Sequence, residues 1–325
     1  MGRDLIDEYT GSREDGIHMP PAPFMQKAIM MVAVVVPFIG CIAACILTWQ
    51  YGWMGWPYLM MLLGGWIIST LGITVGFHRL CTHRSFETYR VVRAFWMAVG
   101  TLSVQGAPLI WCAVHRRHHG HSDQEGDPHS PNLGGPGIWG TIKGFWHGQV
   151  GWLFSGHWSK PELEKYVPDL TRDRMLTLIN NHYYIIVIAS LAIPAAMGYF
   201  AEAWFGNGLR SPWFGALLGV LWGGLVRIFF THHVTWSINS VCHLFGRRHF
   251  HSDDHSTNNL ICALLSMGEG WHNNHHAFPT SAKHGLFWYQ FDASWVVINM
   301  MKWMGLAWNV KVPTEKVLES RRIAS

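Results

Sequence analysis

The chain contains several long runs of apolar residues without a charged side chain. The first two occupy residues 29–48 and 56–77, and two comparable runs follow at 184–201 and 213–230, the last with Arg227 near its end. An α-helix rises about 1.5 Å per residue, so about 20 apolar residues cross the roughly 30 Å hydrocarbon core of a bilayer. Backbone polar groups inside that core must be satisfied within the segment. The sequence therefore predicts four transmembrane helices.

The composition agrees with a membrane protein. Charged residues make up 14% of the 325 positions and hydrophobic residues 49%, whereas soluble domains carry roughly 25% charged residues. The first apolar run starts too far from the N-terminus and is too long for a cleaved signal peptide, so we expect it to remain as a span. We predict an all-α integral membrane protein with one domain over residues 1–325 and with peripheral tails at 1–24 and 310–325.

The distribution of Lys and Arg predicts which ends of the spans face the cytosol. Residues 49–55, between the first two runs, carry no charge, and only Arg210 is basic between the third and fourth. Basic residues cluster before the first run, after the second, before the third and after the fourth. By the positive-inside rule, both termini and two segments, 78–183 and 231–309, are cytosolic. The net charge of +4 suits contact with anionic lipid headgroups and does not indicate nucleic-acid binding.

A fifth uncharged run complicates this topology. Residues 94–114 are also long enough to cross a bilayer. Gly100, Gln105, Gly106 and Pro108 interrupt the run, and a transmembrane helix tolerates such interruptions. If this run crossed, the histidines after it would face the opposite side of the membrane from those before it. Hydropathy alone leaves the question open.

Histidines gather in four short motifs, each near the end of an apolar run. The motifs read "HRLCTH", "HRRHH", "NSVCH" and "GEGWHNNHHAFP", in chain order. An imidazole is costly to bury without a partner, so this crowding requires something that offsets the desolvation. The residues concerned are His78, His83, His115, His118, His119, Asn239, His243, His272, His275 and His276.

The spacings predict that these side chains converge. Separations of three and four place side chains on one helical face, as within "HRRHH", "NSVCH" and "HNNHH". The separation of five in "HRLCTH" puts its two histidines about 140° apart on a regular helix. That pair converges only if the helix ends or loosens there.

Nine histidines and one amide exceed the four ligands of a structural zinc site and divide sensibly over two metals. Nitrogen ligands suit iron, copper, zinc or nickel, so the ligand type does not select the metal. Soluble di-iron bundles use paired Glu-x-x-His motifs, and only Glu269 and His272 have that spacing here. An open pair of redox metals beside a membrane fits oxygen activation on a lipid-like substrate.

The four motifs resemble the histidine boxes of membrane fatty-acyl desaturases, specifically the stearoyl-CoA (delta-9) type. The resemblance extends from about Leu71 to Asn309 and includes "GDPHSP" after the second box and "DDHSTNN" before the fourth. It implies two hairpins of transmembrane helices under a cytosolic helical cap. It also implies that residues 94–114 lie on the cytosolic side and do not cross.

The resemblance implies two irons, with O2 as co-substrate. One iron is expected to be held by His78, His83, His115, His119 and His275. The other is expected to be held by His118, His243, His272 and His276, with Asn239 fixing a water ligand. Such a centre uses O2 and two electrons to remove two hydrogens from an unactivated methylene pair, inserting a cis double bond, most simply at C9–C10.

The resemblance also implies a bent substrate tunnel. Gln105, Trp111, Thr235 and Trp236 occupy matching offsets from the second and third boxes, and Trp66 is a weaker candidate for the tunnel floor. Four further side chains are candidates for supporting the ligands from behind: Asp127, Asp254, His232 and His233. Six histidines lie near the boxes but outside their pattern and are not assigned as ligands: His121, His129, His249, His251, His255 and His284.

The expected partners are a fatty-acyl substrate, most simply an acyl-CoA, and a separate electron donor. Basic residues near the boxes could bind the phosphates of CoA, although positive-inside topology explains them equally well: Arg79, Arg116, Arg117, Arg247 and Arg248. The sequence has no "HPGG" haem-binding stretch, so a ferredoxin, cytochrome b5 or reductase is expected to supply electrons. The membrane is expected to be a bacterial inner membrane or the endoplasmic reticulum.

Two alternative functions remain. A membrane hydroxylase or alkane monooxygenase could use the same iron ligation, and labelled O2 distinguishes it from a desaturase because only hydroxylation leaves label in the lipid product. A histidine-rich metal transporter is the second alternative function. Transporters place polar ligands near the bilayer midplane inside their spans. Here the histidines lie beyond the ends of clean spans, which argues against transport.

Overall fold

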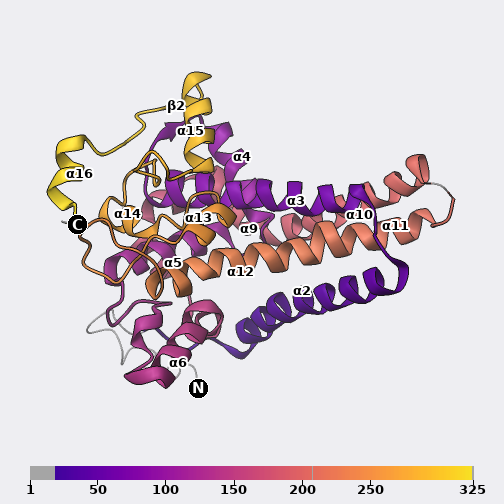
Figure 1. The fold of residues 1–325 in the computed structure, drawn as a ribbon, viewed down its shortest axis with the longest axis horizontal. Helices are drawn as coiled ribbons and strands as arrows, with labels where there is room; N and C mark the ends of the chain where they lie inside the picture. The colour runs from indigo at the N-terminus through magenta and orange to yellow at the C-terminus, as the bar shows by residue number, and fades with distance from the viewer. Residues whose placement is uncertain (1–18, 207, 324–325) are drawn as a thin grey trace, which may run out of the picture.

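The computed structural model describes residues 19–206 and 208–323 and is built almost entirely of helices (Figure 1). Within these residues, four helices are long and apolar enough to cross a membrane: Phe24–Tyr51, Trp56–Thr82, Tyr183–Phe205 and Pro212–His243. Each contains one of the four predicted runs and extends beyond it. The short antiparallel pair β1 (Glu87–Thr88) and β2 (Ala307–Trp308) is the one sheet in the described part of the chain. The predicted class, an all-α integral membrane protein with four spans, is confirmed.

The second and fourth long helices are not regular throughout. The first and third long helices are single α-helices, α2 (Phe24–Tyr51) and α10 (Tyr183–Phe205). The second begins as α3 (Trp56–Leu71) and continues as the wider π-helix η1 (Gly72–Thr82). The fourth runs through α11 (Pro212–Gly219), the π-helical η4 (Val220–Val226), α12 (Arg227–Ser240) and the turn η5 (Val241–His243). Both π-helices therefore lie within spans whose ends carry histidine motifs.

The ambiguous run at 94–114 folds as two shorter helices, α4 (Arg90–Thr101) and α5 (Pro108–His121). The chain turns between them, where Val104 and Gly106 adopt positive φ angles of 60° and 96°. The carbonyl of Leu102 accepts hydrogen bonds from Ser190 (2.8 Å) and from the buried Arg227 (2.9 Å), so side chains of the third and fourth spans cap the end of α4. This run does not form one continuous helix.

Close helix packing fixes α4 and α5 against the second span. A Cβ on Gly72 would lie 2.3 Å from the backbone nitrogen of Gly100, so these two helices touch backbone to backbone. The core beside this contact includes the fully buried Phe77, Met97 and Cys112. This packing positions the ends of η1 and α5 next to each other, and both ends carry histidines.

The remaining helices cluster at one end of the four spans (Figure 1). They are η2 (Pro131–Leu133), α6 (Gly137–Gln149), η3 (Gly151–Phe154), α7 (Lys160–Tyr166), α8 (Pro168–Thr171), α9 (Arg174–Asn181), α13 (Leu260–Leu265), α14 (His272–Ala277), α15 (Ala293–Trp303) and α16 (Glu315–Arg321). The predicted cap thus corresponds to a real layer of short helices and loops.

The structure describes the two predicted tails to different extents. Residues 1–18 of the N-terminal tail lie outside the described residues, and the backbone NH of His157 bonds to the carbonyl of Pro20 at 2.7 Å. The C-terminal tail is described as far as residue 323, and part of it forms α16. The Arg321 side chain donates to the carbonyl of Ala277 (2.8 Å), and its backbone carbonyl accepts from the backbone NH of His251 (2.7 Å), so α16 contacts the end of α14 and the segment that precedes the fourth histidine motif.

Candidate metal centre

The structure brings all nine histidines of the four motifs into two adjacent groups. In each group the nearest ring nitrogens all lie within 4.8 Å of one another. The five-histidine group is His78, His83, His115, His119 and His275, and the four-histidine group is His118, His243, His272 and His276. The two groups contain the same residues as the two ligand sets that the resemblance implies.

The π-helix explains how "HRLCTH" contributes both its histidines. The backbone NH of His83 bonds to the carbonyl of His78 at 3.0 Å, a separation of five residues. This is the hydrogen bond of a π-helix, which brings residues five apart onto one face. The two rings lie 4.7 Å apart between centroids. The helix therefore loosens at this point, as convergence of the pair requires.

Two pairs of consecutive residues are divided between the groups. On α5, His118 belongs to the four-histidine group and His119 to the five-histidine group. On α14, His276 and His275 divide in the same way. Each helix therefore supplies neighbouring residues to both groups.

The two asparagines of "HNNHH" hold α14 in place. The side-chain oxygen of Asn273 accepts from the backbone NH groups of His249 (2.8 Å) and Phe250 (2.9 Å). Asn274 donates to the carbonyl of His284 (2.8 Å) and to the side chain of Gln290 (2.7 Å). A helix of six residues has little stability of its own. These bonds tie it to the surrounding loops.

Four carboxylates fix the orientation of four of the rings. Each carboxylate accepts from, or lies in contact with, the Nδ1 of one histidine, and that nitrogen therefore carries the hydrogen. The pairs are His78–Glu269 at 2.5 Å, His118–Asp127 at 3.0 Å, His243–Asp123 at 2.8 Å, and His276–Asp254. In a neutral ring this leaves a lone pair on Nε2.

Lone pairs consequently face one another in the four-histidine group. The Nε2 atoms of His118 and His276 are 3.4 Å apart, and both rings have Nδ1 on a carboxylate. The Nε2 atoms of His243 and His272 are 3.0 Å apart. Two inward lone pairs repel unless a cation lies between them. This arrangement has the chemistry of a metal site rather than of a hydrogen-bonded cluster.

The five-histidine group shows the same excess of acceptors. The Nε2 atom of His275 is 3.1 Å from that of His78 and 2.9 Å from that of His119. His119 in turn contacts His115 at 3.1 Å. One ring nitrogen holds at most one hydrogen or one lone pair, so these contacts cannot all be hydrogen bonds between neutral rings. The Nε2 of His83 is also buried without a hydrogen-bond partner among the described residues.

The distances fit nitrogens that share one ion. Two nitrogens each about 2.1 Å from a metal lie about 3.0 Å apart at a right angle and about 3.4 Å apart at the tetrahedral angle. The observed contacts, from 2.9 Å to 3.4 Å, cover this range. The residues present therefore fit two metal ions.

Burial and mutual repulsion keep most of the rings neutral. Burial lowers the pKa of one set of rings well below its usual value, and the neighbouring imidazoles lower it further: His115, His119, His272 and His275. Burial also lowers the pKa of His276 to about 4. Burial lowers the pKa of His118 as well, but Asp127 opposes this and leaves it raised. Neutral imidazole is the form that binds metals.

The structure adds residues that the sequence patterns did not identify. Asp123 and Glu269 hold His243 and His78, although Glu269 was considered only as a partner of His272. Glu269 also bonds the completely buried Arg79, at 3.2 Å and 3.1 Å. Arg79 in turn reaches Asp292 at 3.0 Å. The spacing of these residues along the chain does not predict the contacts, because each residue's partner is distant in sequence.

The predicted supporting residues fall into two classes. Asp127 and Asp254 contact the ligand candidates His118 and His276, as suggested. The other two predicted residues bond elsewhere. The Nε2 of His232 lies 3.0 Å from the carbonyls of Ser103 and Val104, and the Nδ1 of His233 accepts from Gln149 at 3.2 Å. The latter two histidines thus hold the loop before α5 and helix α6.

Two histidines outside the motif pattern are buried beside the groups. The Nδ1 of His284 lies 3.4 Å from Glu269, and its ring centroid lies 4.5 Å from that of His275. His129 lies with its centroid 4.3 Å from that of His118. His251 and His255 are exposed. Position relative to the motifs therefore did not separate buried from exposed histidines.

Replacing Asp254 with Asn should weaken metal binding without unfolding the protein. The amide cannot accept the Nδ1 hydrogen of His276 as strongly as the carboxylate, so the ring loses orientation and basicity. Loss of such a supporting group typically costs about 10–100-fold in metal affinity. Metal content measured during graded chelation should show this shift, and the exposed Asp253→Asn is the matched control. Identical chelation curves would contradict the role of Asp254.

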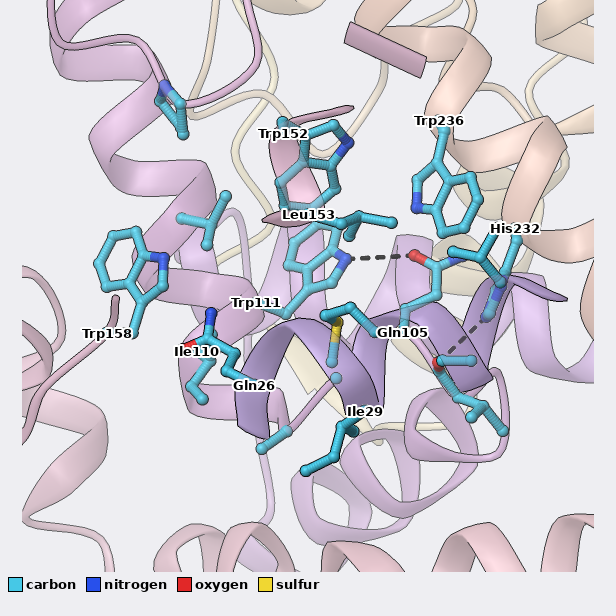
Figure 2. A pocket seen from close by; sticks show the side chains of 18 of the residues that line it. Gln26, Ile29, Gln105, Ile110, Trp111, Trp152, Leu153, Trp158, His232 and Trp236 are labelled. Atoms are coloured by element: carbon cyan, nitrogen blue, oxygen red, sulfur yellow. Dashed lines mark hydrogen bonds between the residues drawn. The ribbon is translucent and has the colours of Figure 1, made fainter. Parts of the chain in front are cut away.

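A large cavity reaches the histidine groups at His115, and Figure 2 shows side chains that line it. Its volume is about 950 Å³, and it is lined by the candidate ligands His115 and Asn239 together with mostly apolar side chains. Four predicted tunnel residues also line it: Gln105, Trp111, Thr235 and Trp236. Trp66 is not among the lining residues; its ring packs edge-on against Phe230 at 5.3 Å.

Two side-chain hydrogen bonds hold residues that line the cavity. The indole nitrogen of Trp111 donates to Gln105 at 3.3 Å (Figure 2). Gln105 donates to the carbonyl of Thr231 on α12 at 3.4 Å. The Trp111 ring also stacks on His115, with centroids 5.2 Å apart. One wall of the cavity is thus in contact with a candidate metal ligand. A chain lying along this wall would pass beside the metal groups.

Comparison with known proteins agrees with these features. Residues 51–309 match the model of the family described as fatty acid desaturase. An hex-5-enoyl-[acyl-carrier protein] acetylenase from Moorena producens (strain JHB) is 41% identical over 89% of this chain and 88% of its own length. An sn-1 stearoyl-lipid 9-desaturase from Anabaena variabilis is 39% identical over 77% and 82%. An acyl-CoA C20 Delta5-desaturase from Anemone leveillei is 36% identical over 77% and 72%.

These relatives are similar to the chain over most of both lengths, and the matched region contains all four histidine motifs. Four spans, clustered histidines and an adjacent apolar cavity are what oxidation of a membrane-borne acyl chain requires. The chain belongs to the fatty acid desaturase family.

Proposed function

We propose that this acyl desaturase inserts one cis double bond near the middle of a saturated acyl chain, most simply at C9–C10. The two methylenes each lose one hydrogen, and O2 takes up these two hydrogens with two electrons and two further protons, giving two waters. One observation carries the proposal. The cavity wall built on Trp111 contacts His115, so an acyl chain held there lies beside the candidate metal ligands.

We further propose that the metals are two irons. The five-histidine group would hold one and the four-histidine group the other, with Asn239 positioning a water at the second. When bound, the irons supply the redox chemistry that activates O2. Nitrogen ligands alone also suit copper, zinc or nickel. The family reaction is an oxidation that requires a redox-active metal, which zinc is not. The choice of iron among the remaining metals rests on the resemblance of the histidine motifs.

The protein side chains position the acyl chain and exclude water from the site. Gln105 and Trp111 are hydrogen-bonded to each other in the cavity wall, and in this proposal they hold a short stretch of the acyl chain beside the metal groups. Fixing the reacting carbons in this way lowers the entropic part of the barrier. The predominantly apolar lining keeps bulk water from the site and prevents side reactions of reactive oxygen species.

The proposal includes a cytosolic site and a separate electron donor. The bias of Lys and Arg toward the segments that carry the motifs supports this orientation, with both termini on the same side. The membrane would be a bacterial inner membrane or the endoplasmic reticulum. A ferredoxin, cytochrome b5 or reductase would deliver electrons from that side. CoA is the carrier that the sequence favours, while the relatives named above act on acyl-carrier-protein, lipid and CoA substrates.

The direct test is the fatty-acid profile of cells that express the protein. Gas chromatography with mass spectrometry should show a new monounsaturated acid whose double bond lies at C9. Growth under labelled O2 should leave no label in this product, because desaturation transfers both oxygen atoms to water. A hydroxylated, labelled product would support the monooxygenase alternative. An unchanged profile, with iron-loaded protein and a functioning donor, would contradict the proposal.

A further inference from the structure

Each histidine group has one further imidazole packed against it. His284 lies beside the five-histidine group and is 1% exposed, and His129 lies beside the four-histidine group and is 3% exposed. Neither residue belongs to the sets of five and four whose ring nitrogens converge. We refer to His284 and His129 as the outer histidines.

The fold fixes the backbone of His284 and leaves its ring nitrogens without a hydrogen bond. Its backbone NH donates to Asp292 at 2.8 Å, and its carbonyl accepts from Asn274 at 2.8 Å. The Nδ1 lies 3.4 Å from Glu269 but not in hydrogen-bond geometry, and neither ring nitrogen has a hydrogen-bond partner among the described residues. The ring lies over that of His275, with centroids 4.5 Å apart and planes inclined at 31°. This imidazole is therefore held against one ligand candidate and against a carboxylate that orients another.

The same arrangement occurs at the four-histidine group. The backbone NH of His129 donates to Oδ1 of Asp127 at 3.0 Å, and the Nδ1 of His129 lies 3.8 Å from the same oxygen. This nitrogen is buried and has no hydrogen-bond partner in the described part of the chain. The ring lies 4.3 Å from that of His118 between centroids, with planes inclined at 33°. Asp127 also holds the Nδ1 of His118, so one carboxylate contacts both a ligand candidate and an outer histidine in this group too.

The nitrogens without hydrogen bonds argue against a role in folding. A buried polar atom without a partner destabilises a fold, and an apolar side chain of similar volume is neutral or stabilising at such a position. Stability therefore does not explain why these two positions hold imidazoles. Groups that lie behind metal ligands do have a function that requires polar atoms, because they orient the ligand ring and adjust the basicity of its metal-binding nitrogen.

We propose that the outer histidines are positioning residues, each acting on the metal of one group through the carboxylate and the ligand ring that it contacts. An imidazole dipole beside a carboxylate changes how strongly that carboxylate attracts the Nδ1 hydrogen of the ligand. The face of the outer ring also limits how far the neighbouring ligand ring can tilt. The inference rests on the two irons of the proposed function and is independent of the substrate and of the position of the double bond.

Substitution by leucine separates positioning from packing, because leucine is close to histidine in volume and has no polar side-chain atom. The metal-free His284→Leu and His129→Leu proteins should melt at the parental temperature, since no described residue hydrogen-bonds to the Nδ1 of either ring. After loading with iron enriched in the Mössbauer isotope, the two irons should give separate signals. His119→Ala and His272→Ala assign these signals, because each variant removes a ligand candidate of one group.

We expect each leucine variant to affect one iron. His284→Leu should change the Mössbauer signal of the iron in the five-histidine group and weaken its retention during graded chelation by about tenfold or more. His129→Leu should do the same to the iron in the four-histidine group, so each variant is a control for the other. Asparagine at either position keeps a polar atom where Nδ1 lies and should retain the iron better than leucine. His255→Leu should change neither signal, because His255 is exposed.

Each other result would contradict the proposal. Parental signals and parental chelation in one leucine variant would overturn the assignment of that residue. Equal weakening of both irons in each variant would indicate general loosening, and a lowered melting temperature of the metal-free leucine proteins would assign the rings to folding; either result would overturn the positioning role. A parent protein without iron in either group would overturn the proposed metals and this inference together, whereas a loaded parent that forms no unsaturated product would overturn the proposed function alone.

Discussion

Replacing His275 with Ala is expected to abolish desaturation and to remove metal from the five-histidine group. His275 is completely buried, and its Nε2 lies between those of His78 and His119, at 3.1 Å and 2.9 Å. Alanine leaves the other rings without the nitrogen that completes the group. The loss in activity should exceed the roughly 10–100-fold that follows removal of a group that only supports a ligand. Iron per protein and the fatty-acid profile are the two measurements.

Two further variants make this result interpretable. His119→Ala should behave in the same way, because His119 belongs to the same group. His251→Ala should leave iron content and activity unchanged, because that side chain is exposed. His284 is a poorer control than its position in the sequence indicates, since it is buried against Glu269. Full turnover in His275→Ala or His119→Ala would disprove the assignment of that residue as a ligand.

Replacing Glu269 with Gln is expected to reduce both stability and metal binding. The carboxylate accepts from His78 (2.5 Å) and from Arg79, which is completely buried. The amide removes the negative charge and leaves Arg79 with Asp292 as its remaining acidic partner. Breaking a buried ion pair from one side costs about 3–5 kcal/mol, and the retained pair places this variant toward the lower end. Metal affinity should also fall, because His78 loses its orienting partner.

Thermal unfolding in detergent and metal retention during chelation are the two measurements for this variant. Glu319→Gln is the matched control, because that carboxylate is exposed and its pairing with Arg322 is a surface contact. A Glu269→Gln protein with the parental melting temperature and the parental iron content would contradict the role given to this residue.

The sequence predicted the helical class and the convergence of the histidines because both follow from spacing. Runs of about 20 apolar residues specify spans, and separations of three and four specify one helical face. The pair His78 and His83 was the exception, since five residues fit a regular helix poorly. A π-helix resolves this, and its hydrogen bond depends on packing around η1 that spacing does not reveal.

The supporting carboxylates were only partly predictable. Asp127 and Asp254 stand near the motifs and were candidates for supporting ligand imidazoles, but the sequence did not indicate that their partners are His118 and His276. Asp123 pairs with His243, 120 residues away, and Glu269 pairs with His78, 191 residues away in the other direction. One sequence contains no signal for such pairs. They depend on how the second and fourth spans place their ends against α5 and α14.

Hydropathy did not predict where loops interrupt the helices or how the helices pack together. The run at 94–114 breaks at Val104 and Gly106, where positive φ angles end one helix before the next begins. Capping of the Leu102 carbonyl by Arg227 and Ser190 stabilises that break. Likewise, α2 packs on the fourth span at Gly40, and hydropathy does not show which of its side chains line the cavity.

The division of His118 from His119, and of His275 from His276, has a consequence for evolution and design. Adjacent residues are about 3.8 Å apart along the backbone and about 100° apart around a helix. The backbone geometry of two separate helices therefore sets the distance between the two metal positions. A one-residue insertion or deletion in either helix would displace ligands of both metal positions at once. Substitutions can therefore change the ligand type at one position, but the spacing between the positions cannot be changed by altering one helix alone.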